Sequence, residues 1–261
     1  MTREVIRMSI KMIVSDLEGT LLRSDKTISE NTINILNQCK ALGHRMIFST
    51  ARPPRDAYKY LPEAFKDEIV SCYNGALVLN GYEVLYHKGI SKASVLRIIA
   101  LAQTYQLGDI YVEIEDVLYT NTTPTHHFDW NCQIVDFNKL DFEDALKITI
   151  HYDDFVDASF LLKLPSECHA IFTDQNNLCQ IMHKDVSKFN SIKRASKFLN
   201  LEDKEIIAFG DDYNDLEILR NSDVGVAMKN ATDAVKSVAN FITLSNDDEG
   251  VASFLKGYIL S

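Results

Sequence analysis

The residues best suited to chemistry in this chain are acidic and hydroxyl groups that follow apolar runs. Asp16 ends the run MIVS, and Glu18 follows two positions later on a glycine-bearing turn. Thr50 follows the run MIFS, and Asp211 follows the run IIAFG. In open α/β sheets the carboxyl ends of parallel strands meet at one crevice, so we expect Asp16, Thr50 and Asp211 to lie close together.

This set of residue types suits phosphoryl transfer through a covalent intermediate. A carboxylate such as Asp16 attacks phosphorus, while hydroxyl groups, turn amides and a fixed cation stabilise the charge on the transferred group. Lys188, at the start of a predicted helix, is a candidate for that cation. Clustered carboxylates without neighbouring cysteine or histidine are typical Mg²⁺ ligands.

Each of these residues also has a plain structural explanation. A strand-end aspartate such as Asp16 forms turns, and Thr50 is placed to cap the next helix. The acidic stretch DDYND favours a helix start through the helix dipole, and Lys188 fits a solvated surface charge. The functional interpretation therefore depends on finding these residues together.

Strand and helix patterns alternate from Lys11 to about Gly81 and again from Ser187 onward, which predicts right-handed βαβ units and a parallel sheet. In the first stretch we predict strands at 11–15, 44–50 and 68–78, and helices at 29–42 and 54–65. In the second we predict helices at 187–200, 213–222, 231–240 and 248–259, and strands at 205–211, 224–228 and 241–244.

The segment from about Tyr82 to Asp185 has a different pattern. Its apolar and polar residues alternate more clearly, which indicates a sheet with one wet face. Predicted strands lie at 82–87, 109–114, 117–121, 146–152, 169–173 and 178–183, with helices at 91–105 and 153–164. We therefore predict an α/β fold with a Rossmann-like parallel-sheet core domain, residues 1–81 and 186–261, and an inserted α+β domain, residues 82–185.

Composition excludes several classes of function. The chain has 261 residues and a formal net charge of −10, which argues against nucleic acid as a partner. It has neither an apolar run of bilayer length nor a signal-peptide pattern at its start, so we expect a soluble, cytoplasmic protein without membrane partners. The five cysteines form no CxxC pair and are expected to be buried free thiols in a reducing compartment.

Four segments in order resemble the motifs of the haloacid dehalogenase superfamily: DLEGTLL, STARP, SKFNSI and FGDDYNDLEIL. Other segments, outside these four motifs, are similar to the Cof-type subgroup: YNGALV, VGVAMKNA, AVKSVANFIT and NDDEGVASFL. In that subgroup a C2-type cap domain is inserted between the second and third motifs. The resemblance implies that residues 82–185 form such a cap.

The resemblance also implies a role for each matching position. Asp16 corresponds to the nucleophile and Glu18 to the general acid and base. The implied Mg²⁺ ligands are Asp16, the backbone carbonyl of Glu18, Asp211, and Asp215 through water. Lys188 would steady Asp16 and the phosphate. The implied phosphate- and substrate-binding positions are Thr50, Ala51, Arg52, Asn74, Gly75, Lys188 and Asn214.

Three positions depart from the family pattern. Glu18 replaces the usual aspartate, and Ala51 and Phe189 replace usual glycines. Glutamate is one methylene longer, so we predict that Glu18 acts from a less favourable position and that Glu18→Asp raises turnover. The alternative is that the site has adapted around the longer side chain, in which case Glu18→Asp is slower.

The leading functional prediction is a Mg²⁺-dependent phosphatase that acts on small phosphorylated metabolites, with sugar phosphates among the candidates. The alternatives are a phosphotransferase or mutase on the same scaffold, and a metal- and phosphate-binding protein without catalysis. The segment TNTTPTHHFDWNC, with His126, His127 and Trp130, is either a substrate-facing patch or an element that packs its aromatic residue on the inserted sheet.

Overall fold

The computed structural model describes residues 10–123, 131–151, 158–173, 178–201 and 205–261. The chain divides into two compact units. The core unit comprises Met1–Tyr86 and Ser187–Ser261, and the inserted unit comprises His87–Val186. The insertion predicted from sequence spans 82–185, so the first boundary of the compact unit lies five residues further along the chain.

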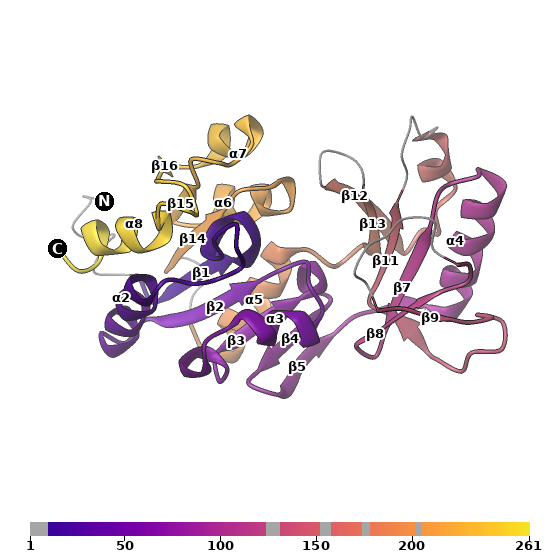
Figure 1. Cartoon of the computed structure of the whole chain (residues 1–261), viewed down its shortest axis with the longest axis horizontal. Coiled ribbons are helices and arrows are strands. Elements are labelled where there is room, and N and C mark those ends of the chain that lie inside the picture. The colour runs from indigo at the N-terminus through magenta and orange to yellow at the C-terminus, as the bar shows by residue number, and fades with distance from the viewer. Residues whose placement is uncertain (1–9, 124–130, 152–157, 174–177, 202–204) are drawn as a thin grey trace. The chain divides into compact units, whose positions relative to one another are not determined.

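The core unit is built on an eight-stranded sheet in the order β16-β15-β14-β1-β2-β3-β4-β5. Strand β1 (Met12–Asp16) lies between β2 (Arg45–Ser49) and β14 (Ile206–Gly210), as Figure 1 shows. The other strands are β3 (Ile69–Cys72), β4 (Leu77–Asn80), β5 (Glu83–His87), β15 (Val224–Ala227) and β16 (Phe241–Ile242). Every neighbouring pair from β16 to β3 is parallel, whereas β4 runs antiparallel to β3.

The strand order places a topological switch point at β1. The chain proceeds from β1 to β2 and β3 in one direction, and from β14 to β15 and β16 in the other. Crevices beyond the carboxyl ends of such strands are where α/β proteins bind ligands. The predicted α/β class, with a Rossmann-like parallel core, is confirmed.

Two helices of the core unit begin at serine caps. Ser29 accepts a hydrogen bond from the Thr32 amide at the start of α2 (Glu30–Ala41), and Ser187 accepts one from the Asn190 amide at the start of α5 (Lys188–Phe198). Each serine satisfies an amide that the first helical turn leaves unpaired. The remaining helices are α3 (Pro54–Tyr60), α6 (Leu216–Asn221), α7 (Asp233–Val238) and α8 (Gly250–Tyr258).

The structure corrects three of the predicted elements. The helix predicted over 54–65 ends at Tyr60, because Pro62 disfavours helical geometry at Leu61, which is extended. The strand predicted over 68–78 is two antiparallel strands, β3 and β4, separated by the turn Tyr73–Gly75. The strand predicted at 82–87, assigned to the insertion, is β5 of the core sheet.

The inserted unit contains a six-stranded sheet in the order β12-β13-β11-β7-β8-β9. Its pairs are antiparallel except for β8 with β9. The strands are β7 (Ile110–Ile114), β8 (Val117–Thr120), β9 (Gln133–Ile134), β11 (Lys147–His151), β12 (Cys168–Thr173) and β13 (Leu178–His183). A separate two-stranded sheet pairs β6 (Ile90–Ser91) with β10 (Asp144–Ala145).

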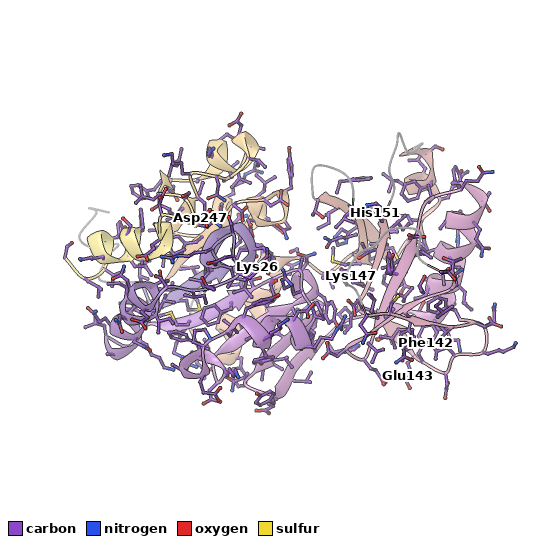
Figure 2. All side chains as sticks on the ribbon, viewed as in Figure 1. Lys26, Phe142, Glu143, Lys147, His151 and Asp247 are labelled. Atoms are coloured by element: carbon purple, nitrogen blue, oxygen red, sulfur yellow. The ribbon has the colours of Figure 1, made fainter. Side chains whose placement is uncertain are left out.

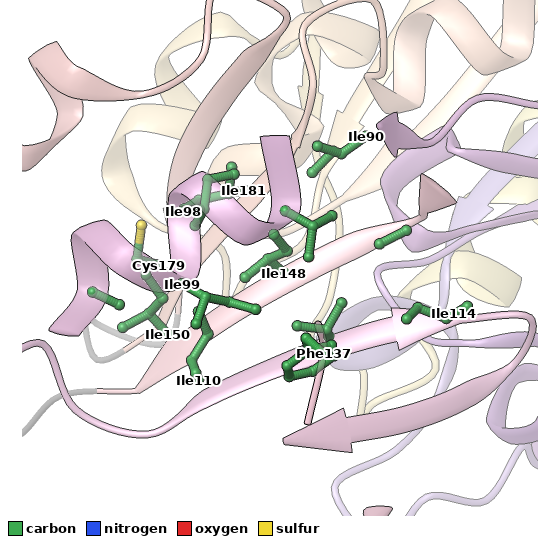
Figure 3. Packing of buried hydrophobic residues seen from close by; sticks show 14 of the residues in the cluster. Ile90, Ile98, Ile99, Ile110, Ile114, Phe137, Ile148, Ile150, Cys179 and Ile181 are labelled. Atoms are coloured by element: carbon green, nitrogen blue, oxygen red, sulfur yellow. The ribbon is translucent and has the colours of Figure 1, made fainter. Parts of the chain in front are cut away.

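The two faces of the inserted sheet differ in chemistry. On one face, Ile98 and Ile99 of α4 (Lys92–Thr104) pack in one buried cluster with Ile110, Ile148 and Ile181 of the strands, as Figure 3 shows. Alternation sends the neighbouring residues of each strand to the opposite face. That face therefore carries polar side chains from three strands, namely Tyr111, Glu113, Lys147, Thr149, His151 and Gln180.

The polar face is not the wet face that the sequence predicted. Lys147 and His151, labelled in Figure 2, are each 8% exposed, and Thr149 between them is also buried. Hydrophobic alternation identifies which residues share a face, but it does not report whether that face is covered.

Other predictions about the insertion and the thiols have mixed outcomes. The helix predicted over 153–164 is described only as a short 3₁₀ helix, Ala158–Lys163. His126, His127 and Trp130 lie outside the described residues. All five cysteines are free thiols; Cys39, Cys72 and Cys179 are buried as predicted, whereas Cys132 and Cys168 are only partly buried. Among the described residues, no helix is both long enough and apolar enough to cross a bilayer.

Candidate active site

A buried lysine links two aspartates from separate elements. The Lys188 ammonium donates to Oδ1 of Asp16 at 2.6 Å and to Oδ1 of Asp215 at 2.7 Å. Asp16 is the last residue of β1, Lys188 is the first residue of α5, and Asp215 follows β14. All three side chains are buried. Three segments distant in sequence thus meet at the carboxyl end of the sheet, as the sequence predicts.

Burial and neighbouring charges set the protonation of Asp16 and Lys188. Burial raises the pKa of Asp16 well above its usual range; the Lys188 charge opposes this, and neighbouring carboxylates reinforce it. Burial lowers the pKa of Lys188, but the charges of Asp16 and Asp215 outweigh it and hold that pKa above its ordinary value. Lys188 is therefore a permanent cation at neutral pH.

Asp211 completes a cluster of three carboxylates. Oxygens of Asp16, Asp211 and Asp215 lie within 4.8 Å of one another. Thr20 donates to Oδ1 of Asp211 at 2.8 Å. Gly19, at φ +69°, passes so close to the Asp211 carboxylate that a Cβ there would collide with it. Burial and the charge of Asp215 raise the pKa of Asp211 to about 7.

Asp215 is oriented by its own backbone turn. Its Oδ2 accepts from the amides of Asp211 and Asp212 at 3.1 and 3.2 Å, while Oδ1 accepts from Lys188. Asp212 in turn accepts from the Tyr213 amide at 2.8 Å. Asp215 is thereby fixed as an acceptor at both oxygens, so it supports the neighbouring groups without turning toward another partner.

The donor set fits a hard divalent cation. Lys188 supplies one positive charge against the three clustered carboxylates, and the raised pKa values of Asp16 and Asp211 express the remaining repulsion. Magnesium prefers carboxylate oxygens and relieves such repulsion. Glu18 contributes no side-chain oxygen to this cluster; its predicted ligand is the backbone carbonyl, in a turn that departs from helical geometry at Glu18 and Gly19.

The Glu18 carboxylate is engaged elsewhere. Its Oε2 accepts from the Thr50 hydroxyl at 2.8 Å, and its Oε1 accepts from Nε of Arg52. The Arg52 amide donates to the same Thr50 hydroxyl at 3.0 Å. Burial lowers the pKa of Arg52, but Glu18 outweighs this and raises it overall. Ala51 lies half-buried in the loop between these two partners.

The predicted Asn74-Gly75 turn also approaches this loop. The Asn74 amide donates to the Thr50 carbonyl at 2.9 Å, and the Asn214 side chain donates to Oδ1 of Asn74 at 2.9 Å. Gly75 has φ +104°, and a Cβ there would lie 2.5 Å from the Ser187 carbonyl oxygen. Glycine at this position therefore permits the close approach of the turn to the start of α5.

Comparison with known proteins agrees with these motifs. The model of a haloacid dehalogenase-like hydrolase family matches residues 13–255. The chain belongs to this family. It is 31% identical over 262 residues to 5-amino-6-(5-phospho-D-ribitylamino)uracil phosphatase YitU of Bacillus subtilis, with 95% of this chain and 97% of that protein covered.

Other haloacid dehalogenase-like hydrolases align over nearly the full chain. Pyridoxal phosphate phosphatase YbhA of Escherichia coli is 24% identical over 286 residues, covering 97% of this chain and all of that protein. A crystal structure of a haloacid dehalogenase-like hydrolase from Bacteroides thetaiotaomicron superposes with a TM-score of 0.79 at 25% identity, covering 95% of this chain and 99% of that one. The predicted superfamily is thus confirmed.

Sequence reasoning missed supporting residues of the hydrolase site. Ser71 donates to Ser191 at 2.7 Å, and Ser191 donates to the Lys188 carbonyl at 2.6 Å, so two buried hydroxyls anchor the first turn of α5. Serines at strand and helix positions carry no sequence signal for this contact. Thr20 lies inside the first motif, DLEGTLL, so its position beside Asp16 in that motif is a sequence signal that could have identified it. Phe189 is half-buried, with the Lys193 ammonium 5.4 Å from its ring centroid.

Proposed function

We propose that this chain is a Mg²⁺-dependent phosphatase that hydrolyses small phosphate monoesters through an aspartyl-phosphate. The observation that carries the proposal is the Lys188 ammonium, held between Asp16 and Asp215 beside Asp211. A carboxylate nucleophile needs a fixed cation and a charge-neutralising ligand before it can approach an anionic phosphate. Lys188 is the fixed cation, and the three carboxylates are candidate ligands for the metal ion that neutralises charge.

In the first half-reaction, an Asp16 carboxylate oxygen forms a bond to phosphorus while the bond from phosphorus to the ester oxygen breaks. Glu18 donates a proton to that leaving oxygen, which departs as an alcohol. Thr50 and Lys188 stabilise the charge on the transferring group. When bound, Mg²⁺ would supply charge neutralisation, and the residues that would hold it are Asp16, the backbone carbonyl of Glu18, Asp211, and Asp215 through water.

In the second half-reaction, water attacks the phosphorus of the aspartyl-phosphate and transfers a proton to Glu18. The bond between phosphorus and the Asp16 oxygen breaks, which regenerates the carboxylate and releases inorganic phosphate. The same carboxyl group acts first as acid and then as base, so each cycle returns Glu18 to its starting protonation state.

The names of the relatives suggest which substrates to test first. One acts on a uracil that carries a phosphorylated ribityl chain, and another acts on pyridoxal phosphate. Both substrates are phosphate monoesters attached to a compact nitrogen heterocycle. We propose this class, together with sugar phosphates, as the substrates, and the inserted unit as the cap that selects among them.

The proposal is tested by measuring phosphate release from these compounds with Mg²⁺, with excess chelator, and with Mg²⁺ restored. We expect release only when Mg²⁺ is present, and acid quenching during turnover should trap phosphate on Asp16. Phosphate transfer to an added polyol without net release would instead identify a phosphotransferase. Metal binding without release or transfer across the series would indicate a non-catalytic protein.

A further inference from the structure

The Glu18 carboxylate is held at both oxygens by the loop after β2. Oε2 accepts from the Thr50 hydroxyl at 2.8 Å, and Oε1 accepts from Nε of Arg52. The backbone amide of Arg52 donates to the same hydroxyl at 3.0 Å. The three residues therefore form a closed ring of hydrogen bonds, in which Glu18 provides only acceptors.

The Thr50 hydroxyl has a single proton to donate. In the Thr50–Glu18 contact the hydroxyl donates that proton to Oε2 of Glu18. Under the proposed function, the same proton is needed on a phosphoryl oxygen. Substrate binding must therefore transfer the Thr50 hydrogen bond from Glu18 to the phosphoryl group, and Arg52 remains as the partner that holds Glu18.

Arg52 is itself fixed from two sides. Its guanidinium lies 4.9 Å from the centre of the Tyr60 ring, at the end of α3, within the range of a cation–π contact. Its backbone carbonyl accepts from the Tyr73 amide at 3.0 Å. Because the planar guanidinium presents donors in a fixed direction, this support fixes the place of the oxygen that it binds.

We propose that Arg52 is a positioning residue that adapts this site to glutamate at position 18. It retains Oε1, so that Oε2, once released by Thr50, takes up a proton from solvent and donates it to the leaving oxygen. An aspartate would be about 1.5 Å shorter and would not reach both partners. The inference rests on the proposed phosphatase activity and favours the adapted-site alternative, in which Glu18→Asp slows turnover.

A purely structural ion pair between two loops is the competing explanation. It predicts that loss of Arg52 weakens all substrates alike. A positioning role predicts a dependence on the leaving group, because poor leaving groups need the proton from Glu18 most. Two substrates separate these explanations: 4-nitrophenyl phosphate, which has a good leaving group, and an alkyl phosphate accepted by the unmutated chain.

The test is a double-mutant cycle of Glu18→Asp and Arg52→Gln, with kcat and KM measured on both substrates. For the alkyl phosphate we expect each single variant to lower kcat by about 10- to 100-fold, and the double variant to be no more than about threefold slower than Arg52→Gln. For 4-nitrophenyl phosphate we expect losses below about threefold. Arg52→Lys should recover part of kcat, because it keeps the charge without the planar fork.

Lys59→Gln is the matched control. The Lys59 ammonium lies 5.5 Å from the same Tyr60 ring, and the variant removes this second cation while it leaves the three contacts of Glu18 and Thr50 in place. It should keep the kcat of the unmutated chain on both substrates. Circular dichroism and thermal unfolding verify that every variant is folded.

The outcomes separate the inference from the function on which it rests. Equal losses on both substrates in Arg52→Gln, fully multiplicative effects of the two substitutions, or faster turnover in Glu18→Asp would overturn the positioning role alone. An unmutated chain that hydrolyses no phosphate monoester, with or without Mg²⁺, would overturn the phosphatase proposal and this inference with it.

Discussion

The two large sheets of the molecule use their surfaces differently. In the core sheet, β1 and β14 are buried along their whole length, and the polar side chains that form the site lie at or beyond the strand ends. In the inserted sheet, β11 alternates between Ile148 and Ile150 on the apolar face and Thr149 on the polar face. The core sheet therefore gathers its polar groups at one edge, whereas the inserted sheet spreads its polar groups over a buried face.

This difference teaches where each kind of substitution should act. Groups at an edge converge on one point, which suits chemistry on a single phosphorus atom. Groups spread over a buried face pack against their neighbours, so a substitution there changes the shape of the inserted unit and not the chemistry at phosphorus. We therefore expect changes at the core edge to alter rate, and changes on the polar face to alter the ranking of substrates.

The largest effect is expected for Asp16→Asn at the core edge. The amide keeps the shape of the side chain but removes the nucleophilic charge, so kcat should fall by at least about four orders of magnitude. The fold should persist, because one of several mutually repelling carboxylates is removed. Asp25→Asn, on an exposed turn, is the control. Phospho-enzyme formation by Asp16→Asn at the normal rate would identify another nucleophile.

A smaller loss is expected for Gly75→Ala, which changes no chemical group. The new Cβ would lie 2.5 Å from the Ser187 carbonyl oxygen and 2.9 Å from Cβ of Ser191, so the start of α5 must move and take Lys188 with it. We expect kcat/KM to fall about 10- to 100-fold, with a stability cost on the order of 1–3 kcal/mol. Gly257→Ala, with nothing within 4 Å, should leave both unchanged. Full activity in Gly75→Ala would contradict this dependence on backbone approach.

Without metal, the core edge should make stability depend on pH. The pKa of Asp211 rises from 3.8 in an ordinary setting to about 7 in the folded chain, and that of Asp16 also rises. The folded state therefore binds more protons than the unfolded state between these values, so the free energy of unfolding falls as pH rises toward about 7.

Urea unfolding of the chelator-treated chain at pH 5, 6 and 7 measures this slope. Asp211→Asn should reduce it, by at most about 1.4 kcal/mol per pH unit for one proton. Added Mg²⁺ should also reduce it, because bound metal displaces the protons. The same slope in the unmutated chain and in Asp211→Asn would show that this carboxyl group does not titrate differently in the two states.

The smallest effect is expected on the inserted sheet. Thr149→Val removes one hydroxyl from the polar face at nearly constant volume, and should change relative kcat/KM among phosphorylated substrates by a few-fold while Mg²⁺ affinity stays constant. Ile148→Val on the opposite face should cost about 1 kcal/mol of stability and leave the ranking unchanged. An unchanged ranking in Thr149→Val, or a changed one in Ile148→Val, would break the proposed division between the two faces.

Sequence reasoning was strongest where function and strand ends coincide. Asp16, Asp211 and Lys188 are predictable because strand ends and helix starts leave local patterns, and because the four motifs come in a fixed order. The contact between Glu18 and Arg52 is not predictable in this way, since it depends on side-chain rotamers of two separate loops. The sequence alone led us to expect that Glu18 was poorly placed, whereas its two partners favour a site built around its length.

The assignment of β5 shows a second limit. The sequence pattern at 82–87 predicts a strand correctly. It does not predict which sheet the strand joins, because that depends on long-range pairing. In the structure β5 lies beside β4 in the core sheet. The burial of Lys147 is a similar case. Periodicity places it on the polar face, but whether that face meets water depends on the tertiary structure.

The junction at Val186 and Ser187 has a consequence for exchanging modules between relatives. The inserted unit ends at Val186, and Lys188 is the first residue of α5, so only Ser187 separates the insertion from the ammonium that binds Asp16. One residue added or removed within that first helical turn would rotate later positions by about 100°. A transplanted insertion must therefore be joined upstream of Val186, where a change in length leaves the serine cap and its lysine in register.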